Sequence, residues 1–251
     1  MRALGRIATH GYAGSQPSKP TQGAVPYRTR PNLCNVEGPA KLGVAGPSRI
    51  HEPLAGRMVD GMGLTVVGIG GSMREDSQSE RALSVVLHSA RLAGADTVAI
   101  TGTELVLPFY DPAVLERSTA ARRLVNVLRE ADGVVLVSPG YHGTVSGLVK
   151  NALDYVEDLR ADTRPYLDGR AVGCVAMALG WQAAVTTLTA LRSIVHALRG
   201  WPTPLGAALN AGEVTFDPHG NLSDPAVERT LRTIGEQVVD FAQARVSHIA
   251  P

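Results

Sequence analysis

Four side chains that could bind a phosphate group lie within eight residues of one another. They are three hydroxyls and one guanidinium, at Ser72, Arg74, Ser77 and Ser79, and they follow the apolar run 64–67. A strand that breaks into glycines and then enters a helix presents free N–H groups and a positive dipole end to an anion. An arginine adds a charge-assisted hydrogen bond. The stretch therefore predicts a phosphate site.

The spacing within this stretch narrows the kind of phosphate. Met73 stands where the third glycine of G-x-G-x-x-G would be, and the Gly-Lys-[Ser/Thr] of a nucleotide P-loop is missing. A dinucleotide or a nucleoside triphosphate is therefore not expected, and a terminal phosphate monoester is. The alternative is that Ser77-x-x-Glu80 is a capping box that starts a helix with no ligand. A cap needs neither the preceding glycine pair nor Arg74, so phosphate binding is favoured.

The elements that must position these groups alternate between strands and helices from residue 64 onward. Expected strands are 64–69, 96–101, 133–138, 171–178 and about 205–209, and expected helices are 79–92, 117–131, 145–159, 183–198 and 224–244. Strands that are apolar on both faces and alternate with helices indicate a parallel sheet covered on both sides. Five such units predict an α/β, flavodoxin-like, doubly wound five-stranded sheet of order 2-1-3-4-5. Ligands of such sheets gather beyond the carboxyl ends of strands, where the phosphate stretch lies.

Residues 1–63 differ in composition from the rest of the chain. They carry eight Lys and Arg against three acids, a net of +5, and the remainder therefore carries −4. Pro and Gly recur there without a helical or strand period, which predicts a disordered or irregular N-terminal extension before a domain at 64–251. A transit peptide, or an over-extended gene start with Met58 or Met62 as the true initiator, are the alternatives.

Bulk composition argues against several classes of protein. The mildly acidic main body does not suggest a nucleic-acid surface. No apolar run approaches the ~20 residues that cross a bilayer, and the apolar segment of a secretory signal is missing. Cys34 and Cys174 are too few and too far apart for a disulfide framework or a metal site. We expect a cytoplasmic protein with no membrane, metal or nucleic-acid partner.

Three motifs together resemble the NADPH-dependent FMN reductase family, whose members are flavodoxin-like. They are G-S-x-R-x-x-S-x-S at 71–79, LPFYDP at 107–112 and SPGYHGTVSGLVKNALDYVEDL at 138–159. The resemblance covers 64 to about 243. It implies that FMN binds with its phosphate on Ser72, Arg74, Ser77 and Ser79 and on the backbone of Gln78.

The resemblance also implies a second flavin-binding segment, which lies along the isoalloxazine ring. It consists of Pro139, Gly140, Tyr141, His142 and Gly143. Glycines there let backbone amides approach the flavin edge, and Tyr141 could pack on the ring or the ribityl chain. Turn packing or surface exposure is the alternative for Tyr141 and His142. Ser146 is expected to cap the next helix, and Lys150 and Asn151 could be exposed or lie at a subunit contact.

One segment departs from the family pattern. Many members have a glycine-rich loop after the fourth strand, whereas this chain reads ALGWQAA, with Gly180, Trp181 and Gln182. We expect these three residues to lie at the flavin site, with Gln182 at the pyrimidine edge. Trp181 could instead fill a subunit interface. This departure concerns the substrate pocket and leaves the flavin-binding motifs intact.

The function implied by the resemblance is that of an NAD(P)H-dependent FMN reductase. Hydride passes from nicotinamide C4 to flavin N5, with NADPH or NADH as co-substrate, and electrons go on to a small molecule or a flavin-dependent monooxygenase. This transfer needs no side-chain acid or base, so no catalytic residue is nominated. A quinone, azo or chromate reductase with bound FMN and a non-enzymatic flavodoxin-type carrier are the alternatives. A homodimer or homotetramer is also implied, because the segment 183–201 is apolar around most of its circumference.

Overall fold

The computed structural model describes residues 63–74, 77–217 and 220–249. The strands are β1 (Thr65–Gly70), β2 (Asp96–Thr101), β3 (Gly133–Tyr141), β4 (Thr144–Val145), β5 (Ala171–Ala178), β6 (Trp201–Pro202) and β7 (Ala207–Asn210). The helices are α1 (Gln78–Leu92), α2 (Thr119–Glu130), α3 (Gly147–Asp154), α4 (Trp181–Ala197) and α5 (Pro225–Ile249), with 3₁₀ turns η1 (Gly102–Leu105) and η2 (Tyr155–Leu159). The extension predicted for 1–63 lies, except for Gly63, outside the described residues, so the domain boundary stays a prediction.

The strands form one sheet in the order β2-β1-β3-β5-β6, and all of these pairings are parallel. Since β7 also pairs with β5, β6 and β7 share the fifth position. The predicted order 2-1-3-4-5 therefore holds for the main strands, with two differences. The fifth strand is in two pieces, because Pro202 at the end of β6 and Pro204 shortly after it have no N–H for a continuous ladder. The short β4 adds an antiparallel partner to the end of β3.

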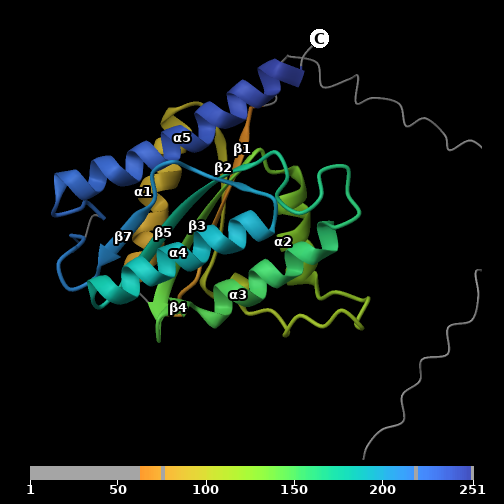
Figure 1. Cartoon of the computed structure of the whole chain (residues 1–251), viewed down its shortest axis with the longest axis horizontal. Helices are drawn as coiled ribbons and strands as arrows, with labels where there is room; N and C mark the ends of the chain where they lie inside the picture. The colour runs from red at the N-terminus through yellow and green to blue at the C-terminus, as the bar shows by residue number, and fades with distance from the viewer. Residues whose placement is uncertain (1–62, 75–76, 218–219, 250–251) are drawn as a thin grey trace, which may run out of the picture. The chain divides into compact units, whose positions relative to one another are not determined.

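Helices cover both faces of the sheet, as the doubly wound prediction requires (Figure 1). On one face α2, α3 and α4 bury side chains such as Leu124, Val149 and Leu191 against the strands. On the other face α1 and α5 do so with Leu83 and Ile234. None of the helices in the described ranges is long and apolar enough to span a bilayer.

Local capping explains where several helices differ from their predicted bounds. Helix α2 begins at Thr119 because the Ser118 hydroxyl accepts a hydrogen bond from the Ala121 amide at 3.2 Å. Helix α3 begins after Ser146, the predicted cap, whose hydroxyl accepts from the Val149 amide at 3.2 Å. Its regular α geometry stops at Asp154, and the rest of the expected helix is the 3₁₀ turn η2.

Candidate functional site

A cavity of about 350 Å³ opens at the carboxyl ends of the strands, beside the switch point between β1 and β3. Its lining comes from four separate strand ends: Ser72, Arg74, Ser77, Gln78, Ser79, Pro139, Gly140, Tyr141, Met177, Ala178, Leu179 and Ala211. Its volume and its position are typical of a ligand site in an open α/β sheet.

The hydroxyl groups of the phosphate stretch are buried at one end of this cavity. Ser72, Ser77 and Ser79 are each at most 6% exposed. Ser77 is the N-cap of α1, accepting from the Glu80 amide at 3.4 Å, and its hydroxyl lies 2.9 Å from that of Ser79. The predicted helix cap is therefore present, and the capping residue still lines the cavity. The capping role therefore does not remove Ser77 from the cavity wall.

Two further groups at this end have polar atoms without hydrogen-bond partners among the described residues. The Arg74 side chain is exposed and its guanidinium has no hydrogen bond to any described residue, although the Arg74 amide donates to Ser72 Oγ at 3.2 Å. Gln78 Oε1 is buried, also without a partner in the part of the chain that the structure describes. Buried hydroxyls, an unpaired amide oxygen and an available guanidinium suit a phosphate ester. The residues present therefore fit the phosphate of FMN.

The carboxylate of Glu80, on the first turn of α1, is directed to another partner. In a capping box the Glu80 carboxylate would return to the Ser77 amide, but here it accepts a hydrogen bond from the Gly102 backbone. Burial raises the pKa of Glu80, and the bond from Gly102 opposes that rise. Glu80 does not line the cavity. The carboxylate is thus held by the turn after β2 rather than by the cavity wall.

The second flavin-binding segment predicted from the sequence is a β-hairpin. Strand β3 continues to Tyr141, turns through His142 and Gly143, and returns as β4. The φ angles of His142 and Gly143 are 51° and 90°, as a two-residue type I′ turn requires. Pro139, Gly140 and Tyr141 line the cavity, whereas His142 and Gly143 form the exposed tip and do not.

In the segment ALGWQAA at the end of β5, Ala178 and Leu179 line the cavity, whereas the three predicted residues Gly180, Trp181 and Gln182 do not. Gly180 precedes α4 with a φ of 138°, and Gln182 is exposed on the first turn. The Trp181 indole donates to Glu213 Oε1 at 2.9 Å and is 52% exposed. The lining residues that the motifs did not indicate are Met177, Ala178, Leu179 and Ala211. The rule that ligands gather at strand carboxyl ends could have indicated the first three.

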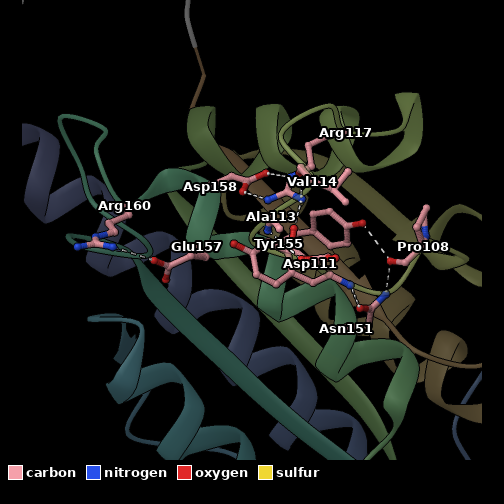
Figure 2. Close-up of polar contacts among 11 residues, drawn as sticks. Pro108, Asp111, Ala113, Val114, Arg117, Asn151, Tyr155, Glu157, Asp158 and Arg160 are labelled. Carbon is pink, nitrogen blue, oxygen red and sulfur yellow. Dashed lines mark hydrogen bonds and ion pairs between the residues drawn. The ribbon is translucent and has the colours of Figure 1, made fainter. Parts of the chain in front are cut away.

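Lys150 and Asn151 also lie away from the cavity. Asn151 accepts from the Tyr110 amide at 2.9 Å and donates to the Pro108 carbonyl at 3.0 Å, so it holds the LPFYDP segment (Figure 2). The Lys150 ammonium forms an ion pair with Asp154 one turn along α3. Two of the sequence motifs are thus joined by Asn151 rather than by a ligand.

The sequence pattern of NADPH-dependent FMN reductases matches residues 64–214, more than half of the chain. The chain belongs to this family. It is therefore an enzyme, a flavin-dependent oxidoreductase with FMN and a nicotinamide nucleotide as its redox partners.

Curated relatives and solved structures extend this result. The chain is 26% identical over 129 residues to an NADPH azoreductase of Bacillus sp. (strain OY1-2), covering 51% of this chain and 69% of that protein. It is 28% identical over 132 residues to an FMN-dependent NADPH-azoreductase of Staphylococcus aureus, covering 52% and 66%. The matched segments thus span about two thirds of these relatives.

Two solved structures have the same fold. An oxidoreductase of Corynebacterium diphtheriae superposes with a TM-score of 0.60 at 17% identity, covering 72% of this chain and 97% of that one. The flavoenzyme NAD(P)H:acceptor oxidoreductase of Paracoccus denitrificans gives 0.55 at 18% identity, covering 73% and 99%. At these identities the two structures support the flavodoxin-like fold alone.

Proposed function

We propose that this protein is an NAD(P)H-dependent FMN reductase that binds its flavin in the cavity at the carboxyl edge of the sheet. The observation that carries the proposal is the convergence of two predicted segments on that cavity. Buried hydroxyls and Arg74 stand at the N-terminus of α1, and the backbone of Pro139 and Gly140 stands on the hairpin. One end suits a phosphate monoester and the other suits the polar edge of a flat ring.

In this proposal each group has a binding or orienting role. Ser72, Ser77 and Ser79 donate their hydroxyls to the phosphate, Arg74 adds the positive charge, and the first amides of α1 complete the anion site. The hairpin and the side chain of Tyr141 orient the ring. Bound FMN supplies hydride and electron transfer, so none of these residues needs to act as an acid or a base.

The identity of the electron acceptor is a second part of the proposal. Both curated relatives described above are named azoreductases. At the cavity Tyr141 is 49% exposed and Leu179 is 87% exposed. Apolar side chains at the mouth of a site suit a flat aromatic molecule, so we infer an azo or quinone acceptor rather than chromate or a protein.

We also propose a homodimer or homotetramer in the cytoplasm, with flavin binding confined to 64–251 and 1–63 as a separate extension. The side chains of Trp181 and Val185, 52% and 51% exposed, form an apolar patch at the start of α4 that supports association. We expect a mass of at least twice the 26.4 kDa chain by light scattering at micromolar concentration. A monomer would contradict this part of the proposal.

Anaerobic addition of NADPH to the purified protein tests the proposed activity. We expect a bound flavin spectrum that bleaches on addition of NADPH or NADH and recovers when an azo dye or a quinone is added. A flavin that stays with the protein through gel filtration is a prosthetic group rather than a substrate. Failure of both nucleotides to reduce the bound flavin would favour a flavodoxin-type carrier.

A further inference from the structure

A buried hydroxyl on α4 has no hydrogen-bond partner among the described residues. Thr187 is 0% exposed, and its Oγ1 is unpaired. Three exposed hydroxyls of the same helix, on Thr186, Thr189 and Ser193, each donate to the carbonyl one turn earlier. Buried unpaired hydroxyls are few in native structures, and each costs about 1–3 kcal/mol. The position of Thr187 therefore calls for an explanation.

The hydroxyl faces the hairpin at a residue that also lines the cavity. A Cβ placed on Gly140 would lie 2.6 Å from Thr187 Oγ1, so the two residues are in contact. Gly140 belongs to the cavity wall. Because it has no side chain, the hydroxyl can approach its main chain directly.

The hairpin is held less firmly beyond this point than before it. Ser138 fixes its base, since the Ser138 hydroxyl donates to the Pro139 carbonyl at 2.9 Å and accepts from the Ser146 amide at 3.0 Å. Farther along, the four residues 141–144 are all exposed, and β4 pairs with β3 at two positions only. The peptide group that links Gly140 and Tyr141 is thus the first one past the fixed base.

We propose that Thr187 is a positioning residue for the flavin ring: its hydroxyl donates to the Gly140 carbonyl when flavin binds. A trans peptide directs its carbonyl and the following N–H in opposite directions. Holding the carbonyl toward α4 therefore directs the Tyr141 amide toward its hairpin partner Thr144, which fixes the part of the cavity wall that Gly140 and Tyr141 form beside the ring. Thr187 touches no ligand and acts only through this peptide.

The inference rests on the proposed function, because it needs flavin in the cavity. It adds a residue that lies in none of the three motifs that carry the family resemblance. The inference also allows binding of the ring to be distinguished from binding of the phosphate. A residue that acts on the ring edge affects FMN and riboflavin alike, whereas a residue that binds the phosphate affects FMN alone.

Thr187→Val, Thr187→Ser and Thr186→Val test the inference, with FMN and riboflavin affinities measured by fluorescence quenching. Thr187→Val replaces the hydroxyl with a methyl group of similar size. We expect it to weaken both flavins by about threefold to tenfold, the usual effect of one hydrogen bond. The same variant should raise the melting temperature of the flavin-free protein, because no unpaired hydroxyl remains buried. Thr187→Ser should restore both affinities to within about twofold of the unmodified protein.

Thr186→Val is the matched control, since its hydroxyl is exposed and already paired within the helix. It should leave both affinities unchanged. Unchanged affinities in Thr187→Val, or equal losses in Thr187→Val and Thr187→Ser, would overturn the inference, because packing rather than the hydroxyl would then matter. Failure of the proposed function is a separate result: the unmodified protein would bind neither flavin.

Discussion

Two loops follow the carboxyl ends of the neighbouring strands β1 and β2, and each contains an arginine. In the segment 106–118, Arg117 donates to both carboxylate oxygens of Asp158 at 2.8 Å and to the Asp111 and Val114 carbonyls. Its guanidinium also lies 4.7 Å from the centre of the Tyr110 ring (Figure 2 shows the polar contacts). In the segment 71–77, Arg74 is exposed, and its guanidinium has no hydrogen bond or ion pair with any described residue.

The two loops differ in whether the polar groups of their side chains are paired within the protein. The Arg117 side chain is 13% exposed and that of Asp158 is 21% exposed, so most of this pair is removed from water and its donors are used inside the protein. The bond to Asp158 raises the pKa of Arg117 further. At the cavity, by contrast, the Arg74 guanidinium and Gln78 Oε1 have no hydrogen-bond partner among the described residues. Polar groups that are paired internally hold the chain in place, and those left available can bind a ligand.

Arg117→Ala should have the largest effect on stability. It leaves Asp158 without its partner and two loop carbonyls without their donor, so we expect unfolding free energy to fall by about 2–4 kcal/mol in urea titrations. Lys150→Ala is the control, because that ion pair is exposed and should contribute at most about 0.5 kcal/mol. The folded Arg117 variant should keep its flavin affinity. If the variant lost more flavin-binding free energy than unfolding free energy, Arg117 would also contribute to flavin binding, and the two loops would not differ in this way.

Arg74→Ala should show the reverse pattern. It removes the positive charge that the proposal assigns to the phosphate, so FMN binding should weaken by about 1.5–3 kcal/mol, roughly tenfold or more. Stability should change by less than about 0.5 kcal/mol, since the side chain is exposed. Riboflavin has no phosphate and should bind as before. Fluorescence titrations in which both flavins lose affinity equally would reject the phosphate role.

Gly71→Ala tests how closely the cavity loop packs on α3. A Cβ at Gly71 would lie 2.1 Å from Val149 Cγ2 and 2.9 Å from Ser146 Oγ. Since both neighbours are buried, we expect a loss of about 1–3 kcal/mol in unfolding free energy. Gly147→Ala is the matched control, because nothing lies within 4 Å of its Cβ at the start of α3. It should leave stability equal or raise it by about 0.4–1 kcal/mol. Equal losses of unfolding free energy in the two variants would mean that the close packing at Gly71 does not contribute to stability.

Much of the fold could be predicted because its signals are local. The all-apolar segment 171–178 is a strand with the expected bounds, and Ser77 and Ser146 cap helices where expected. A cap or an apolar run acts over a few residues, so its consequence can be derived from adjacent positions. The split of the fifth strand was not predicted, although its prolines are visible in the sequence.

For the site, the sequence by itself determined which groups could bind a phosphate and which family the motifs resemble. Only the tertiary structure decided which predicted residues share a wall: Pro139, Gly140 and Tyr141 line the cavity, whereas His142 lies at a hairpin tip. It also decided that Thr187 contacts Gly140, 47 positions away along the chain. Such contacts depend on how strands and helices pack against one another. Packing brings together residues whose types and spacing carry no shared local signal.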